Sequence, residues 1–170
     1  MKGPEDPYPN SSDTASAGAK RKRHPFWRWF WLAFLVASLG YAYHSFYVPS
    51  NDVVWADDIA SARQRANESG KNMLLFFTAE WCVPCRIMKR EVFADDEAMT
   101  AINAQVIPVM IHADDPGAEE AFSRYHVGGT PVTIFTDPQG NVIDYAVGRI
   151  GRGRFLEMLD NLGSIGGERL

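Results

Sequence analysis

The sequence predicts an α/β domain, a mixed central sheet of four or five strands flanked by helices, preceded by a single transmembrane helix. Two observations carry this prediction. Strand-like apolar runs alternate with helix-like segments over residues 57–162, the order that builds a sheet covered by helices. Residues 29–51 contain no Asp, Glu, Lys or Arg, and about twenty apolar helical residues span a membrane core. The length of 170 residues allows one domain plus these additions.

Residues 1–25 are predicted to be a disordered, basic, cytoplasmic tail. Residues 1–19 are rich in Pro, Ser, Ala and Gly and hold almost nothing apolar to bury. Residues 20–23 are all Lys or Arg, and neither type occurs between residues 29 and 62. Basic flanks stay on the cytoplasmic side of a membrane segment. We therefore expect a single-pass protein of the inner membrane, with its C-terminal domain in the periplasm.

Residues 26–48 are predicted to be a retained signal anchor, through which the protein contacts the membrane. Tryptophans at one end and tyrosines towards the other resemble the aromatic belts of membrane interfaces: Trp27, Trp29, Trp31, Tyr41, Tyr43 and Tyr47. A cleaved signal peptide and a buried soluble helix are the alternatives. Pro49 ends the helix, and residues 49–56 form a linker.

Charge is spread unevenly along the chain. Residues 1–28 carry six Lys and Arg against three Asp and Glu, and the remainder carries eleven against eighteen. An acidic body argues against nucleic acid as a partner.

Residues 57–170 are predicted to form the domain, and local signals place its first elements. Asp57 or Asp58 caps a helix that Gly70 ends. Residues 73–78 form a strand without polar alternation, as expected of a central strand covered on both faces. A helix follows over residues 86–93.

The second half of the domain is predicted in the same way. Asp95 or Asp96 caps a short helix towards Asn103, and Asp115-Pro116 begins another that reaches Tyr125. Pro108 lies within the strand 105–112 and cannot donate to a ladder, which places that strand near an edge. The remaining elements are strands 132–137 and 141–147, joined by a hairpin turn, and a helix over 152–162.

Cys82 and Cys85 are the only cysteines in the chain. Because they lie between the strand 73–78 and the helix 86–93, Cys82 is placed at a helix N-terminus. Unpaired N–H groups and the helix dipole favour negative charge there, and the thiolate is the reactive form of cysteine. Pro84 suits the first helical turn. The pattern predicts Cys82 as an accessible, low-pKa nucleophile and Cys85 as its shielded resolving partner.

Two other interpretations of the cysteine pair are a structural zinc site and an inert buried pair. A zinc site needs four ligands, but there is no third cysteine and the histidines are scattered: His24, His44, His112 and His126. We expect no metal, and for His112 and His126 no catalytic part. A redox-active dithiol is the preferred interpretation.

A second motif, Gly128-Gly129-Thr130-Pro131, precedes the strand 132–137. With Trp81-Cys82-Val83-Pro84-Cys85, it makes residues 57–162 resemble the thioredoxin superfamily. Flanking residues 70–72 and 91–93 are similar to the branch that includes the periplasmic domain of thiol:disulfide interchange proteins.

The resemblance implies a strand order of 105–112, 73–78, 132–137, 141–147. It implies that Trp81 shields the site, and that Thr130 and cis-Pro131 hold the substrate backbone beside Cys82. One departure is clear: family members carry a buried Asp six residues before the first cysteine, where this chain has Phe76. Glu80 is then the nearest carboxylate in sequence to assist Cys85.

The resemblance also implies a membrane-anchored enzyme that reduces oxidised protein substrates in the periplasm. No organic cofactor is expected besides the Cys82–Cys85 disulfide, and a transmembrane electron-donor protein is expected to reduce that disulfide. A disulfide oxidase or isomerase is the alternative within the class. A non-catalytic, tethered binding module on the same fold is the alternative outside it.

Overall fold

The computed structural model describes residues 25–166, with side chains from 26 to 163. Contacts divide the chain into two compact units that separate between Ser45 and Phe46. The tail predicted over residues 1–25 lies outside the described residues, apart from residue 25.

The first unit contains helix α1 (Pro25–Phe46) except for its last residue, which belongs to the second unit, so the predicted helix is present. Its side chains are exposed on every side. The membrane span predicted over 26–48 is corrected, because no helix among the described residues is both long enough and apolar enough to cross a membrane. The absence of charged residues overstates how apolar this helix is, because the N–H and O–H groups of its Trp and Tyr side chains are polar.

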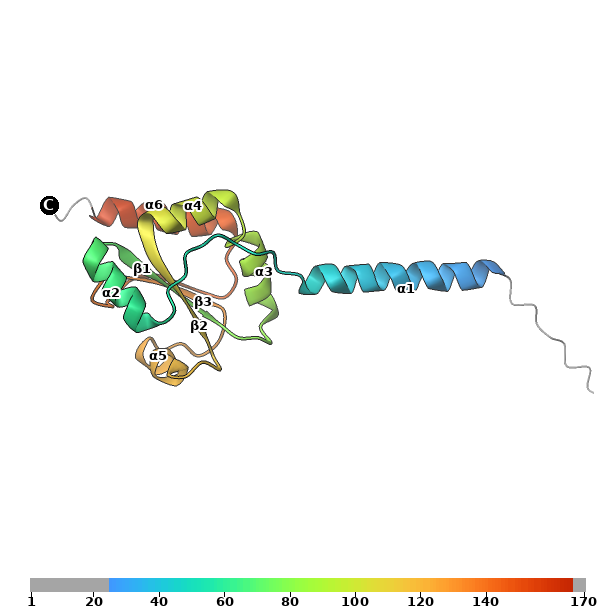
Figure 1. Ribbon diagram of the computed structural model, residues 1–170, viewed down its shortest axis with the longest axis horizontal. Coiled ribbons are helices and arrows are strands. Elements are labelled where there is room, and N and C mark those ends of the chain that lie inside the picture. Colours follow the sequence, from blue (N-terminus) through green and yellow to red (C-terminus); the bar gives the residue numbers. More distant parts are fainter. Residues whose placement is uncertain (1–24, 167–170) are drawn as a thin grey trace, which may run out of the picture. The chain divides into compact units, whose positions relative to one another are not determined.

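The second unit is organised around a four-stranded mixed sheet in the order β2-β1-β3-β4 (Figure 1). The strands are β1 (Asn72–Thr78), β2 (Val106–His112), β3 (Val132–Thr136) and β4 (Val142–Val147). β1 pairs with β2 in parallel, whereas β1–β3 and β3–β4 are antiparallel. The predicted strand order is confirmed.

Five helices cover the sheet: α2 (Ile59–Ser69), α3 (Val83–Glu91), α4 (Asp96–Gln105), α5 (Ala118–Arg124) and α6 (Arg152–Gly166). Buried residues of α3, α4 and α6 pack on one face, and those of α2 and α5 on the other (Figure 1). β1 is buried on both faces. The predicted caps form, because Asp58 accepts from the Ser61 N–H at 2.7 Å and Gly70 ends α2 with φ 71°.

The segment 49–56, predicted as a linker, packs on the domain. Val53 and Ala56 are buried, and Ala56 forms a parallel bridge with Val109 of β2. The Ala56 N–H donates to the Pro108 carbonyl at 2.8 Å. Since β2 is the outermost strand on this side, Pro108 lies on an edge strand, as expected.

Candidate active site at the carboxyl end of the central strand

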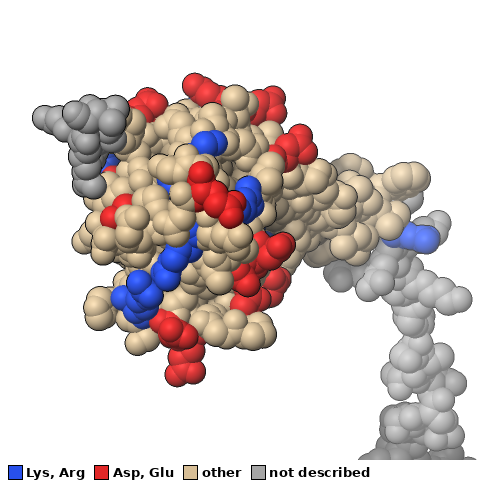
Figure 2. Space-filling view, turned by 60° about the vertical axis from the view of Figure 1, so that its left-hand side comes forward, with Lys and Arg blue, Asp and Glu red and all other residues tan. Residues whose placement is uncertain are grey.

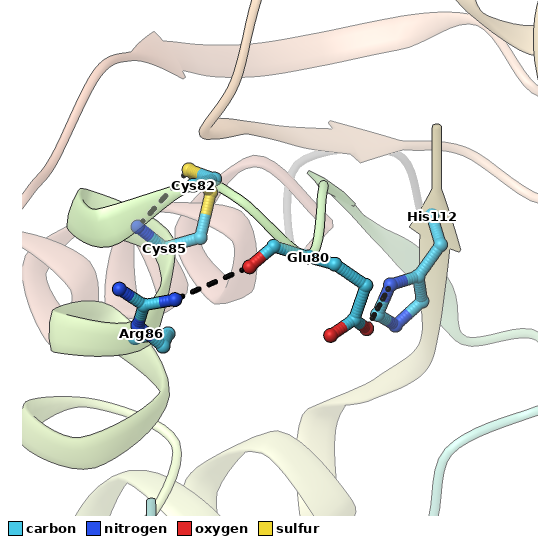
Figure 3. Close-up of a disulfide and its surroundings, with 5 residues drawn as sticks. All are labelled: Glu80, Cys82, Cys85, Arg86 and His112. Atoms are coloured by element: carbon cyan, nitrogen blue, oxygen red, sulfur yellow. Dashed lines mark hydrogen bonds and ion pairs between the residues drawn. A yellow bond between two sulfur atoms is a disulfide. The ribbon is translucent and has the colours of Figure 1, made fainter. Parts of the chain in front are cut away.

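The two cysteines lie where β1 passes into α3. Cys82 occupies the N-cap position of α3, and Pro84 lies in the first turn. Cys82 and Cys85 are joined by a disulfide, with their Cα atoms 5.3 Å apart. The Cys85 N–H donates to Cys82 Sγ at 3.2 Å (Figure 3). One of the unpaired N–H groups of the helix is therefore already directed at the sulfur predicted to act as the nucleophile.

Access to the dithiol differs from the expectation in this oxidised form. Cys82 is only 2% exposed and Cys85 only 1%, so the predicted difference in access between the two is absent here. The flanking Trp81 is 72% exposed, and Val83 is exposed too. An apolar surface thus adjoins the disulfide on the solvent side.

The predicted substrate-binding residues lie at the same edge of the sheet. Phe77 of β1 pairs with Val132, which places Thr130-Pro131 beside the end of β1. Their peptide bond is cis, as predicted, and the Pro131 carbonyl accepts from the Gly148 N–H at 2.8 Å. No hydrogen bond between described residues joins this pair to the cysteines, and the buried Thr130 hydroxyl has no partner there.

Phe76 lies in the same core cluster as both cysteines and is fully buried. Its ring meets that of Phe93 edge to face, with centroids 4.7 Å apart. At the position where the resemblance implies an acid, this chain therefore has an aromatic side chain packed against another ring. Phe76 can accept no proton.

Charged side chains surround the entrance to α3. The Glu80 carboxylate is 3.4 Å from Nδ1 of His112, and its side chain is 81% exposed. Arg86 donates to the Glu80 carbonyl at 3.2 Å, and its guanidinium lies 4.8 Å from the ring centre of Phe46. Figure 3 shows Glu80 between Arg86 and His112, beside the disulfide.

His112 was missed as a neighbour of this site. It ends β2, and its register partner is Thr78 at the end of β1. Parallel strands bring their carboxyl ends to one edge, so this pairing was the signal that could have placed His112 beside Glu80.

Lys89 lies one turn after Cys85 on α3, where residues four apart are neighbours. Burial lowers the pKa of Lys89 below its ordinary value, and the Glu80 carboxylate partly opposes this shift. Side chains on a helix usually point back towards its start, which here is the end that carries the dithiol.

A mixed sheet in the order β2-β1-β3-β4, with a Cys-x-x-Cys disulfide capping the helix after the central strand, defines a thioredoxin-like domain. The model of the thioredoxin-like domain family matches residues 59–163. The chain belongs to this family.

Curated relatives carry the name thiol:disulfide interchange protein. The chain is 36% identical over 76 residues to DsbD 2 of Pseudomonas aeruginosa, a match that covers 44% of this chain and 13% of that protein. It is 34% identical over 86 residues to DsbD of Ralstonia nicotianae, covering 49% and 14%. The chain thus spans a small part of the length of these relatives.

Solved structures share the fold. A thioredoxin from Thermus thermophilus is 26% identical with a TM-score of 0.58, and the match covers 64% of this chain and 86% of that one. The DsbD C-terminal domain of Neisseria meningitidis, in its oxidised form, is 20% identical with a TM-score of 0.52, covering 60% and 90%.

Proposed function

We propose that this domain is a thiol–disulfide oxidoreductase that reduces protein disulfides in the periplasm through Cys82 and Cys85. The hydrogen bond from the Cys85 N–H to Cys82 Sγ is the observation that carries the proposal. After reduction, the same N–H and the helix dipole favour a thiolate on Cys82. The names of the relatives, thiol:disulfide interchange proteins, support the same chemistry.

In the first step, the Cys82 thiolate attacks one sulfur of the substrate disulfide. That disulfide breaks, its second sulfur leaves as a thiolate that takes up a proton, and a mixed disulfide joins Cys82 to the substrate. The exposed Trp81 offers a contact surface, and Thr130 and Pro131 hold the substrate backbone.

In the second step, Cys85 loses its proton and attacks Cys82 Sγ. The bond between Cys82 and the substrate breaks, and the substrate sulfur leaves as a thiolate that takes up a proton. A Cys82–Cys85 disulfide forms, so the two electrons that reduce the substrate come from these two cysteines. Phe76 offers no base for this step. We propose that Glu80, the carboxylate paired with His112, assists deprotonation, and that the Lys89 ammonium stabilises the Cys85 thiolate.

The direction of transfer is proposed from the residues between the cysteines. Val83-Pro84 contains no histidine to stabilise the Cys82 thiolate further, so the reduced dithiol is less stabilised and its disulfide has less tendency to oxidise other proteins. The spent disulfide then needs a reductant, and we propose a separate transmembrane protein with its own dithiol.

The reduction of insulin by dithiothreitol tests the activity. Wild-type protein should accelerate precipitation of the insulin chains. Cys82→Ser should lower the rate to that of dithiothreitol alone, whereas the matched Cys85→Ser should accumulate mixed disulfides with the substrate. Equal rates with and without wild-type protein would favour the non-catalytic binding module.

The reduction potential, measured against glutathione, tests the direction separately. A value near that of thioredoxin, about −270 mV, supports a reductase. A value near that of the strong oxidant DsbA, about −120 mV, favours the oxidase alternative.

A further inference from the structure

The buried polar side chains of the domain are threonines. Lys, Arg, Asp and Glu side chains are scattered over the face shown in Figure 2, whereas the buried polar side chains between residues 26 and 163 are Thr78, Thr133 and Thr136. Each hydroxyl oxygen is buried and has no hydrogen-bond partner among these residues. A buried hydroxyl without a partner raises the free energy of the folded state. Each therefore destabilises the fold, and none has a part in the steps described above.

The register of the sheet places Thr78 on the face that carries the dithiol. Side chains two residues apart on a strand lie on the same face, so Thr78 shares the face of Phe76, which packs in the cluster that includes both cysteines. Thr133 is the cross-strand partner of Phe76 and lies on this face too, but further from the carboxyl end of β1. Thr136 lies on the opposite face, because its register partner is Met73, a member of the other cluster.

Thr78 is also the last residue of β1, at the end of the strand where the dithiol lies. Its register partner on one side is His112 of β2, and His112 contacts Glu80 beside the disulfide (Figure 3). On the other side, the antiparallel register with β3, continued by one residue, places Pro131 next to it. Thr78 therefore lies between two residues that border the dithiol.

Cys85 lies on the face of α3 that packs on the sheet. It and Met88 are the buried residues of that helix, and Cys85 is only 1% exposed. The Cys82 sulfur already has a donor in the Cys85 N–H. A thiolate on Cys85 needs a donor of its own, because a buried charge without hydrogen bonds is unfavourable. Phe76 offers none, whereas the Thr78 hydroxyl is a donor on the same face.

We propose that the Thr78 hydroxyl donates a hydrogen bond to the Cys85 sulfur in the reduced protein and so stabilises the thiolate that attacks the mixed disulfide. When the disulfide is reduced, the two sulfurs are no longer bonded and separate. A thiolate is also a stronger acceptor than a disulfide sulfur. Thr78 keeps its own proton, and the proton of Cys85 still passes to Glu80. This inference rests on the proposed function, since it concerns the second step of that reaction.

The stopped-flow reaction of the reduced full chain with an aromatic disulfide that releases a coloured thiolate tests this contact. A first burst of colour reports the attack of Cys82, and a second burst reports the attack of Cys85 on the mixed disulfide. Cys85→Ser should show the first burst alone. If the wild-type protein lacks the second burst, the proposed function itself fails. If it shows both, the threonine variants test the inference separately.

Thr78→Val keeps the size and branching of the side chain and removes its hydroxyl. The second burst should slow about tenfold or more near neutral pH, the effect of losing one hydrogen bond to a charged group. The first burst should be unchanged. Because the hydroxyl acts on the charged form of Cys85, the pH at which the second burst reaches half its maximal rate should rise by about one unit. At higher pH the two proteins should converge.

Thr136→Val is the matched control, because it removes an equally buried, unpartnered hydroxyl from the opposite face. Its second burst should equal that of the wild type, and Thr133→Val should slow the second burst less than Thr78→Val. In the disulfide form, Thr78→Val and Thr136→Val should melt at or above the wild-type temperature, since neither hydroxyl has a partner there.

Four results would each overturn the proposal. The first is an unchanged second burst in Thr78→Val, and the second is an equal slowing by Thr136→Val. The third is a larger slowing by Thr133→Val, which would assign the contact to the other hydroxyl. The fourth is a disulfide form of Thr78→Val that melts below the wild type, which would show that the hydroxyl is already bonded before reduction.

Discussion

The two faces of the central sheet are packed with side chains of different size. On the α3–α4–α6 face, Phe76, Phe93, Phe135 and Phe155 are all fully buried. Phe93 meets Phe76 and Phe155 edge to face, at 4.7 and 5.5 Å between ring centres. On the α2–α5 face, the helices instead contribute small buried residues: Ala62, Ala66, Ala118 and Ala121.

This difference makes the α3–α4–α6 face rigid and leaves space on the α2–α5 face. Interlocking aromatic rings hold α3, and with it the dithiol, in one position, because such cores leave little room for rearrangement. Small residues on the other face leave hollows, including a pocket of about 350 Å³ between α2, β2 and α5. A second hollow of about 640 Å³ lies where Tyr145 and Val147 of β4 are exposed. The fixed face holds the reacting atoms, and the open face has volume for a ligand.

Phe93→Ala tests the comparison with the largest expected effect. We expect a loss of about 3–5 kcal/mol in unfolding free energy, the usual cost of removing a fully buried Phe. Denaturant unfolding measures it. The matched variant on the open face is Phe122→Ala, whose half-buried ring contacts Phe77 at 5.0 Å. It should cost clearly less, and equal losses would show that the two faces are equally well packed.

Phe76→Asp should have an effect of the same order on stability. It removes a fully buried ring and leaves a carboxylate without a partner among aromatic rings, so we expect a loss of about 3–5 kcal/mol. The new acid should also speed the attack of Cys85 on a mixed disulfide, as stopped-flow release of substrate thiol measures.

Phe77→Asp is the control, because the adjacent Phe77 is equally buried but packs on the opposite face with Phe122 and Tyr125. It should destabilise the domain similarly and leave unchanged the rate at which Cys85 resolves the mixed disulfide. If both variants, or neither, alter that rate, position 76 has no particular influence on the dithiol.

Most of the fold could be predicted because its signals are local. The cap at Asp58, the left-handed Gly70 and the turn at 137–141 each act within a few residues, and the elements they bound are present. The order of the strands is not local, since β1 and β2 pair across an intervening α3 and α4. The order was available only through the resemblance carried by the two motifs.

The candidate site was predictable in part for the same reason. The positions of Cys82, Cys85 and cis-Pro131 follow from short motifs. To predict that His112 lies near Glu80, the register between β1 and β2 would have been needed.

Lys89→Met should have a smaller and opposite effect on stability, and it probes a half-buried cation on the aromatic face. Burial lowers the pKa of Lys89 in the folded state. Between that lowered pKa and the ordinary value of 10.5, the unfolded chain binds more protons, so wild-type stability rises with pH across this window. At neutral pH the variant should gain less than about 1 kcal/mol, since solvent screens half of the side chain.

Melting curves at neutral pH and near pH 10 should show this gain shrinking as pH rises. Lys71→Met is the control, because Lys71 donates to the Asn103 carbonyl at 3.2 Å and should show no gain. If Lys89 stabilises the Cys85 thiolate, Lys89→Met should also slow resolution of the mixed disulfide. A variant that is more stable and equally fast would leave Lys89 without a part in the reaction.

Glu80→Gln should have the smallest effect on stability, below about 0.5 kcal/mol, because the Glu80 side chain is exposed and water screens its contact with His112. Its effect on resolution tests the proposed base. A buried general base contributes about a hundredfold or more, but an exposed carboxylate competes with water, so we expect a slowing of less than about tenfold. His112→Gln, which keeps Glu80 but removes its partner, should slow resolution less than Glu80→Gln. If the order of these two variants is reversed, the proton of Cys85 leaves through the histidine, and the carboxylate serves only to orient the ring.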